Sequence, residues 1–519
     1  MNLFIKRINS KKILYFLIVL ALNWVQFVRA TQYESLIAPA VNASGLLVLF
    51  IVFTQISIKK LQGIFTYVYS ASCALTIIVL TIYRGYLDAP YYYWKYLFVI
   101  MNAWLIGLGI GYVFKEWADG GKIRIKPNLI TILWFAFTAV TVIGFSNKWW
   151  PLWFFLVFGL YYTIPFDKED MRRLYDSIID GTIVSFFIIQ SCAFVFRPYD
   201  EVRYSGLFVN CNDTALYYLI VYVMILVKLH LLHERREKIG FKLFYFFGAG
   251  ALLSFLFMTL SRTGWLAAGI ITFVYGIIIL LLKWKEKAWK VILRGIALFM
   301  SFAITFPIVF SCVRYLPTIH PHPVWFQNEY TVNRVHSFDP RDSEKYVEID
   351  ELLNNSLGRF GSLWSLVEKK IGISSDSYAA ESEIENVYIS LDSDIYFSNS
   401  IAARFLFMKS FLEQSRWLGR DESKVHILYG DRHALMYHSQ NLWVQMTFCF
   451  GYIAGVIVLL LSILITVKRF KVAIISDNPY SILALLLTLV FFIYGLTEVV
   501  WIPGFIVMPL FFLMQKEID

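Results

Sequence analysis

The sequence predicts an all-α protein that crosses a membrane many times. Of its 519 residues, 58% are hydrophobic and only 16% are charged, whereas soluble domains are about 25% charged. Apolar runs recur from residue 13 to residue 514, and a helix needs roughly 17 to 25 residues to cross the hydrocarbon core. Aromatic residues, such as those at 91–94, stand at the ends of these runs, as in interfacial belts.

The apolar runs predict about 12–14 transmembrane helices. The first run lacks a small-residue cleavage site, so we interpret it as a helix and not as a cleaved leader. The pairs at 128–165 and 480–514 could instead be hairpins that enter the membrane without crossing it, and they leave the count open. The predicted helices lie at 13–29, 36–57, 64–83, 93–114, 128–145, 149–165, 178–196, 213–231, 241–260, 264–282, 291–311, 441–467, 480–496 and 499–514.

Every second loop between these runs is rich in lysine and arginine, which orients the chain. By the positive-inside rule such loops face the cytoplasm, so both termini are expected there. The basic loops lie at residues 6–12, 59–60, 115–126, 168–173, 235–242, 283–290 and 468–471. Because the cations are spread among these loops and not gathered in one patch, we expect no nucleic-acid partner.

One long hydrophilic segment, residues 312–440, falls on the outer side of this map. It holds 18 acidic and 13 basic residues, although the whole chain has a net charge of +10. Its aromatic residues predict short helices over the outer mouth of the bundle, one of them between Ser400 and Gly419. The predicted parts are therefore an N-terminal bundle (1–311), a large extracytoplasmic loop (312–440) and C-terminal helices (441–519).

Three short polar stretches on the outer side could carry chemistry. They are 203–213 before the eighth span, 261–264 in a very short turn, and 438–443 where the chain re-enters the membrane. Arg203 and Arg262 suit a diphosphate, because guanidinium binds phosphate oxygens in a planar, bidentate way. His438 is suited to general base catalysis near neutral pH.

Together these residues predict sugar transfer from a lipid diphosphate to a hydroxyl. The five cysteines have no C-x-x-C spacing and no metal motif is present, so we expect neither a metal nor another cofactor, and the arginines would stabilise the leaving group. Each residue also has a purely structural reading. Arg203 could be an interfacial anchor, and Arg404 could lie on the solvated face of a helix. Asp213 is favoured as a helix N-cap, and Glu498 could cap a turn.

These motifs resemble the bacterial O-antigen ligase and O-antigen polymerase superfamily. The matching elements are R-x-x-G-x-x-x-N-x-N-x-x-A from Arg203 to Ala215, Ser-Arg-Thr-Gly at Arg262, S-x-x-x-R ending at Arg404 with Gly419 downstream, His438 followed by Leu442, Gly451 and Gly455, and the late acidic residue Glu498. The chain departs from the family at Cys211, where the family usually has proline, and at Ser439, where it often has asparagine.

The resemblance implies a GT-C-like fold in the bacterial cytoplasmic membrane, with an active site that faces the periplasm or the cell exterior. It implies undecaprenyl-diphosphate-linked oligosaccharide and membrane lipid as partners, with a flippase and a chain-length regulator as further candidates. The implied catalytic residues are His438, Arg262 and Arg203. The implied ligands of the diphosphate or sugar are Arg203, Arg262, Arg404, Asn212 and Glu498.

The leading hypothesis is a polymerase of lipid-linked repeat units, and ligation of finished polymer to another acceptor is the runner-up. A transporter of polysaccharide or lipid-linked sugar would also need many helices and a few charges. Its charges would be expected at the midplane, whereas the candidate residues here gather on one side. A purely structural membrane protein leaves Arg262 unexplained.

The predicted topology is testable by cysteine labelling from outside intact cells. A membrane-impermeant reagent is expected to label single cysteines placed near residues 262 and 350, because the short loop at 262 carries few cations and the long segment 312–440 falls on the same outer side of the map. It is expected to leave cysteines near residues 237 and 286 unlabelled until the cells are opened. Labelling at residue 286 in intact cells would contradict the map.

Overall fold

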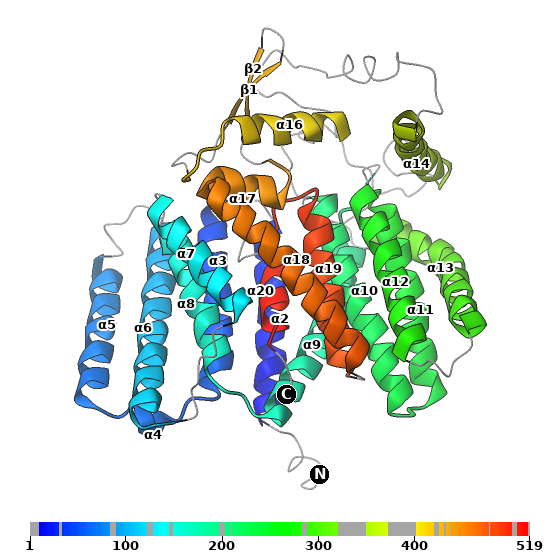
Figure 1. Cartoon of the computed structure of the whole chain (residues 1–519). Coiled ribbons are helices and arrows are strands. Elements are labelled where there is room, and N and C mark those ends of the chain that lie inside the picture. Colours follow the sequence, from blue (N-terminus) through cyan, green and yellow to red (C-terminus); the bar gives the residue numbers. More distant parts are fainter. Residues whose placement is uncertain are drawn as a thin grey trace.

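The computed structural model describes residues 10–30, 34–83, 90–121, 128–144, 149–196, 203–208, 210–282, 288–319, 349–371, 401–419, 425–429, 432–436, 439–476, 478–500 and 506–516. Long helices run side by side in one bundle, and a smaller layer that contains α14 and α16 lies over one end of it (Figure 1). We call this end the loop face and the other end the opposite face.

The helices follow the apolar runs of the sequence closely. The bundle contains α2 (Ser10–Ala30), α3 (Glu34–Phe53), α4 (Ile58–Leu61), α5 (Ile64–Tyr83), α6 (Pro90–Ala118), α7 (Leu129–Gly144), α8 (Trp149–Thr163), α9 (Lys168–Phe196), α10 (Cys211–Glu234), α11 (Ile239–Met258), α12 (Arg262–Leu282), α13 (Ala288–Tyr315), α17 (Leu442–Phe450), α18 (Tyr452–Ile475), α19 (Pro479–Gly495) and α20 (Val507–Leu513). The layer at the loop face contains α14 (Ile349–Ile371), α16 (Ile401–Glu413) and the strands β1 (Val425–Tyr429) and β2 (Arg432–Met436), and η2 (Leu316–Ile319) directly follows α13.

Eight of the described helices are long and apolar enough to cross a membrane: α5, α6, α9, α10, α11, α12, α13 and α18. Shorter apolar helices lie within α3, α7, α8 and α19. The chain is therefore a multi-pass membrane protein built almost entirely of α-helices, as the composition predicts. The finer expectation of about 12–14 crossings stays a prediction.

Helix α10 forms the centre of the bundle. In its most apolar stretch 89% of the residues are buried, whereas none are buried in α5 at the edge. α10 packs against α9, α11, α12 and α19. Because a helix that is apolar on all sides is stable when protein or lipid surrounds it, α10 can be enclosed by protein while α5 faces lipid. The first turn of α10 is therefore held firmly at the loop face.

Three of the predicted helices differ clearly from those observed. The helix expected at 178–196 is the later part of α9, which begins at Lys168 and so includes the expected basic loop 168–173. The run at 441–467 is not one helix, because the chain breaks between α17 and α18 at Gly451, whose φ is +94°. The run at 499–514 is helical only over Val507–Leu513 among its described residues. The outer loop also contains an antiparallel hairpin, β1–β2, where only short helices were expected. The helix expected between Ser400 and Gly419 is present as α16.

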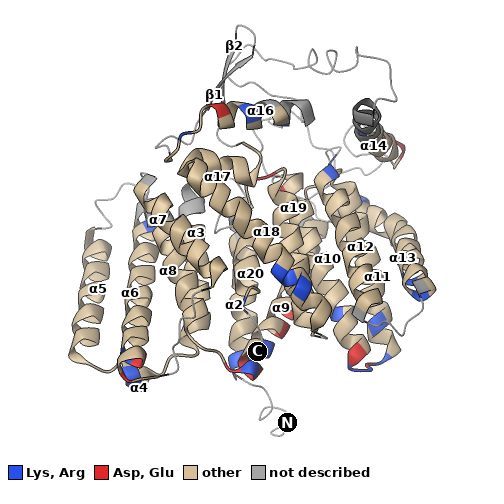
Figure 2. Ribbon diagram, in the orientation of Figure 1, with Lys and Arg blue, Asp and Glu red and all other residues tan. Residues whose placement is uncertain are grey.

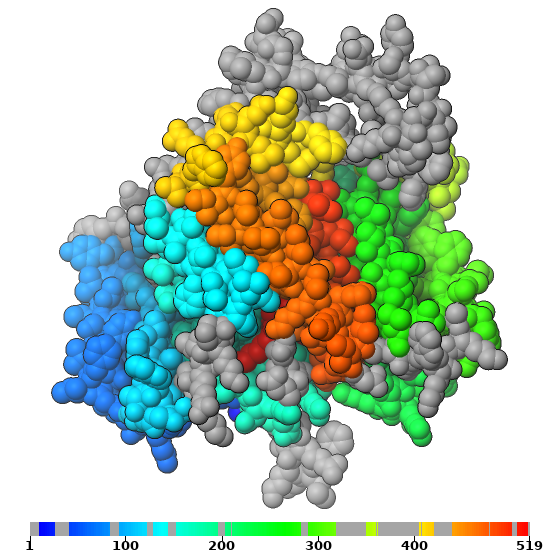
Figure 3. Space-filling model, in the orientation of Figure 1, coloured from blue at the N-terminus to red at the C-terminus, as the bar shows by residue number. Residues whose placement is uncertain are grey.

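Glycines allow the segment after α16 to dock on the junction of α17 and α18. A Cβ at Gly419 would lie 2.1 Å from the carbonyl oxygen of Cys449, and one at Gly451 would lie 2.3 Å from that of Trp417. α16 covers α17 at the loop face (Figure 3). Backbone contact this close is possible only without side chains, which gives a packing reason for two of the motif glycines.

Charged residues are distributed unevenly over the bundle. Lysines and arginines gather at its opposite face (Figure 2). Ion pairs join helices there: Lys11 of α2 pairs with Asp170 of α9, and Lys60 of α4 pairs with Glu116 of α6. This distribution agrees with the expectation that the opposite face is cytoplasmic.

We predict that Gly419→Ala and Gly451→Ala each lower the thermal stability of the purified protein. Overpacking costs about 1–3 kcal/mol. At Gly451, whose φ of +94° and ψ of 164° are essentially restricted to glycine, backbone strain adds roughly 1–3 kcal/mol for a residue with a Cβ. The measurement is thermal unfolding in detergent. Gly240→Ala is the control, since a Cβ at Gly240 meets nothing within 4 Å. Equal melting temperatures for all three variants would contradict the docking.

Candidate functional site

Arg203 lies at the loop face, in the loop that leads into α10. Its Nε donates to the carbonyl oxygen of Thr259 at 3.1 Å, and its Nη2 donates to Oδ1 of Asn212 at 2.8 Å. The backbone nitrogen of Tyr204 donates to the carbonyl oxygen of Met258 at 3.0 Å. The arginine therefore joins the end of α11 to the beginning of α10, and its guanidinium is held in a fixed place.

The glycine and asparagines of the first motif shape this loop. Gly206 has φ +56°, a conformation that glycine adopts at little cost. Asn210 is the N-cap of α10, and its side chain accepts a hydrogen bond from the backbone nitrogen of Asn212 at 2.8 Å. The prediction that Asp213 is the N-cap is therefore wrong. The extended backbone that a cap requires occurs at Asn210, so Asp213 falls inside the first turn.

Arg262 is the first residue of α12, directly after the short turn from α11. The turn contains the buried Leu260 at φ +51°, and Oγ of Ser261 accepts from the backbone nitrogen of Gly264 at 3.3 Å. A Cβ at Gly264 would lie 3.2 Å from the Cβ of Ala215 on α10. The turn is thus packed tightly on α10. Arg262 adds a cation to the positive end of the α12 dipole.

A turn at residues 496–498, directly after α19, connects several of the predicted site residues. Oε1 of Glu498 accepts a hydrogen bond from Nδ2 of Asn212 at 3.1 Å and lies 3.9 Å from Nη2 of Arg404. Nη1 of Arg404 donates to the carbonyl oxygen of Thr497 at 2.8 Å. We call residues 496–498 the connecting turn. Through it, Arg404 of the outer layer and Asn212 of the bundle share one carboxylate.

The connecting turn also holds α12 and α17. Oγ1 of Thr497 and Oγ1 of Thr263 lie 2.9 Å apart in a hydrogen bond. Nδ2 of Asn441 donates to the carbonyl oxygen of Leu496 at 3.1 Å. Elements that are up to 286 residues apart in sequence therefore meet at three consecutive residues.

His438, the predicted general base, lies outside the described residues. The next residue, Ser439, is buried, and its backbone nitrogen donates to Oε1 of Gln445 at 2.8 Å. Asn441 is the N-cap of α17 and accepts from the backbone nitrogen of Val444 at 3.1 Å. Ser439 and Asn441 thus fix the beginning of α17, and the catalytic role of His438 stays a prediction.

The structure adds one arginine, Arg359, that the sequence motifs do not include. Leu352, Ser356 and Arg359 occur at a spacing of four and three residues on α14, so they share one face. Leu352 and Ser356 are buried. Nη1 of Arg359 donates to the carbonyl oxygen of Leu260 at 3.1 Å. α14 thereby places a cation beside the turn between α11 and α12.

Arg203, Arg262 and Arg359 form a cluster of like charges, which we call the arginine cluster. Burial, and then the positive charges of Arg203 and Arg262, lower the pKa of the Arg359 guanidinium to about 10. At that pKa it is still charged at neutral pH. Three cations in partly buried positions repel one another. A bound anion would relieve this repulsion, and a diphosphate offers several oxygens to bidentate donors.

The predicted site residues that the structure describes thus fall into two groups that share Arg203, and His438 lies outside the described residues. Arg203, Asn212, Glu498 and Arg404 are connected by direct contacts, and Arg262 joins the arginine cluster. Within the described part of the chain, no group of three or more His, Cys, Asp or Glu residues could hold a metal ion.

Comparisons with models of protein families, with curated proteins and with solved structures find no match to this chain.

We predict that inorganic pyrophosphate stabilises the purified protein against thermal unfolding. Binding at ten times Kd adds about 1.4 kcal/mol to the free energy of unfolding, and salt should weaken the effect. Arg359→Gln should remove most of this stabilisation, because it removes one of three clustered donors. Lys409→Gln, a change at an exposed residue of α16, is the matched control. Equal stabilisation of both variants by pyrophosphate would show that the arginine cluster does not bind it.

Proposed function

We propose that the protein is a membrane glycosyltransferase that polymerises oligosaccharide repeat units linked to undecaprenyl diphosphate. The observation that carries the proposal is the arginine cluster at the loop face. There Arg203, Arg262 and Arg359 come together from a loop, a helix N-terminus and the outer layer. The proposed setting is the outer face of the bacterial cytoplasmic membrane.

The cluster suits a reaction in which a diphosphate leaves. As the bond from the anomeric carbon to the diphosphate oxygen breaks, negative charge develops on that oxygen. Cations that are already in place stabilise this charge without having to rearrange, and one such donor typically contributes about 10²–10³ in kcat. Arginine stays charged during the reaction and can bind two phosphate oxygens at once.

The position of the cluster supports a substrate that is carried by a lipid. The three arginines lie around the turn between the apolar helices α11 and α12: Arg203 bonds the carbonyl oxygen of Thr259, Arg359 bonds that of Leu260, and Arg262 begins α12. A polyprenyl chain can remain among apolar side chains there while its diphosphate meets the guanidinium groups. The sugars would extend toward α14 and α16, away from the hydrocarbon.

The proposed chemistry assigns the proton to His438. A hydroxyl oxygen of the acceptor sugar forms a bond to the anomeric carbon of the donor, and its proton passes to the imidazole. The diphosphate departs with the electron pair of the bond that breaks. Asn212 and Glu498 act by positioning, since Asn212 bonds both Arg203 and Glu498.

We favour polymerisation over ligation because of the outer layer and the departure at Ser439. A polymerase has to hold a lipid-linked growing chain and a lipid-linked repeat unit together, which favours a large surface that positions sugars. Oγ of Ser439 donates to the carbonyl oxygen of Asn441 at 2.8 Å, so the side chain that directly follows His438 serves the local backbone. A transporter is less consistent with these residues, since they gather at one end of the helices and not at the midplane.

We predict that the purified protein, given one lipid-linked repeat unit and no other acceptor, produces a ladder of longer lipid-linked products. One molecule of free undecaprenyl diphosphate should be released for each glycosidic linkage that is formed. Gel electrophoresis and mass spectrometry of the lipid fraction measure both. Transfer that appears only after a non-repeat acceptor is added would favour a ligase. Movement of the intact lipid-linked unit across vesicles without release of diphosphate would favour a transporter.

In the same reaction, Arg262→Ala and His438→Ala should each abolish the ladder while the protein still elutes as a folded species. Arg262→Lys should restore only part of the activity, because an ammonium group cannot replace the bidentate guanidinium. Lys409→Ala is the control and should retain full activity. Wild-type activity in His438→Ala would exclude His438 as the general base.

A further inference from the structure

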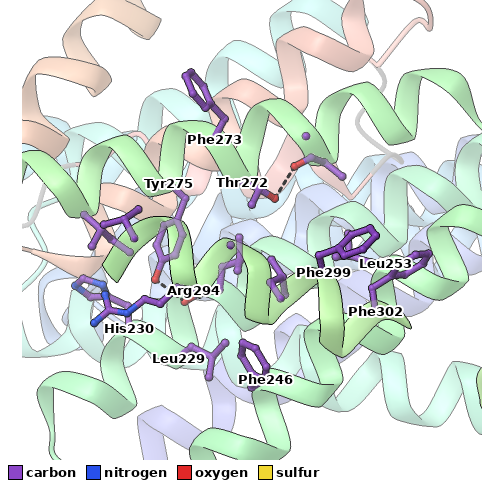
Figure 4. Close-up of a pocket in the computed structure, with 18 of the residues that line it drawn as sticks. Leu229, His230, Phe246, Leu253, Thr272, Phe273, Tyr275, Arg294, Phe299 and Phe302 are labelled. Carbon is purple, nitrogen blue, oxygen red and sulfur yellow. Dashed lines mark hydrogen bonds between the residues drawn. The ribbon is translucent and has the colours of Figure 1, made fainter. Parts of the chain in front are cut away.

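A large cavity lies between α10, α11, α12 and α13, within the membrane-spanning part of the bundle. Its volume is about 1110 Å³, which exceeds that of most ligand pockets. Figure 4 shows Leu253, Phe299 and Phe302 toward one end of the cavity, and His230, Tyr275 and Arg294 toward the other. Neither the arginine cluster nor the connecting turn lines it.

Apart from its charged side chains and histidines, the cavity wall offers few groups to a polar ligand. The hydroxyl of Thr272 donates to the carbonyl oxygen of Ala268 at 2.7 Å, and the hydroxyl of Tyr275 donates to that of Leu226 at 3.2 Å. Nε1 of Trp265 is likewise bonded to a backbone carbonyl oxygen, at 3.2 Å. Because these groups are satisfied within the protein, the space is suited to hydrocarbon chains.

Glycines keep this space open. Gly269 and Gly276 line the cavity from α12, and Gly295 lines it from α13. A Cβ at Gly269 or Gly295 would meet nothing within 4 Å, and one at Gly276 would lie 3.5 Å from the nearest atom. The width of the cavity therefore depends on the small residues of α12 and α13, and a larger side chain there would fill it without a clash.

One end of the cavity is basic. His233, Lys242 and Arg294 line it there, together with His230, whose Nε2 lies 3.2 Å from Oε1 of Glu234. These residues lie near the end of α10 and the beginnings of α11 and α13, at the opposite face. The positive-inside rule predicts that this face is cytoplasmic. Basic pockets between transmembrane helices on that side suit anionic lipid headgroups.

We propose that this cavity binds one anionic phospholipid from the cytoplasmic leaflet. The acyl chains occupy the apolar middle, and the headgroup phosphate lies at Lys242 and Arg294. The site is separate from the proposed active site, because Arg262 begins α12 and the basic end of the cavity lies near the end of that helix. A helix of 21 residues is roughly 30 Å long, so one lipid phosphate cannot serve both places.

A bound lipid would also support the position of α12. α11 packs along α13, and the cavity separates part of α12 from both. Acyl chains in this gap would supply the dispersion contacts that an empty space lacks. The inference stands independently of the proposed function, because it concerns only the cavity and its charges.

The experiment uses the full-length protein in detergent and two photoactivatable lipids with identical diazirine-bearing acyl chains, phosphatidylglycerol and phosphatidylcholine. Peptide mapping after irradiation is expected to place phosphatidylglycerol on α11, α12 and α13. Lys242→Gln combined with Arg294→Gln should lower this labelling roughly tenfold, because two cations near the phosphate are lost. Lys290→Gln is the matched control, since Lys290 is exposed on α13 and does not line the cavity.

A second variant tests the apolar part separately. Gly269→Leu should fill the cavity and lower labelling by phosphatidylglycerol while Lys242 and Arg294 remain. Equal labelling by both lipids in the wild-type protein would overturn the proposal of an anionic ligand. If undecaprenyl phosphate displaces the labelled phosphatidylglycerol and unlabelled phosphatidylglycerol does not, the cavity binds a polyprenyl chain. That result would also overturn the proposal of an anionic phospholipid.

Discussion

The carboxylate of Glu498 is the interaction on which the loop-face site depends. It accepts a hydrogen bond from Asn212, which in turn holds Arg203, and it lies 3.9 Å from Arg404. Cations at the end of an apolar bundle are costly unless they are paired or used. One acidic side chain in the connecting turn thus pairs with Arg404 of the outer layer and, through the amide of Asn212, holds Arg203 in place.

The same turn explains how distant parts of the chain can form one site. α10, α12, α16 and α17 each contribute a side chain that bonds to residues 496–498. The bonds to this turn therefore fix the outer layer to the loop face of the bundle at a few points. The tight packing of Gly419 against Cys449 adds another such point. A reaction that joins a lipid-linked donor to a sugar acceptor needs both layers held in this way.

Much of the fold follows from the sequence, because the length and spacing of apolar runs are local properties. The helices at 64–83 and 241–260 differ from α5 and α11 by two residues at most. The break at Gly451 could not be predicted in this way, since it depends on a contact with Trp417 that is remote in sequence. The β1–β2 hairpin was missed although the sequence contains a signal for it, because Val425, Ile427 and Tyr429 alternate along the first strand and a Gly-Asp dipeptide follows them.

Residues of the candidate site could be predicted from the sequence where they occur in motifs. Residues outside any motif were missed. Arg203, Asn212, Arg404 and Glu498 come together as the motifs suggest. Arg359 has no motif, and the only local signal is its spacing from Leu352 and Ser356 on an amphipathic helix.

The most direct test of the account is a structure of the protein bound to undecaprenyl diphosphate. We expect both phosphates within hydrogen-bonding distance of at least two residues of the arginine cluster. A diphosphate bound away from all three arginines would contradict the central claim.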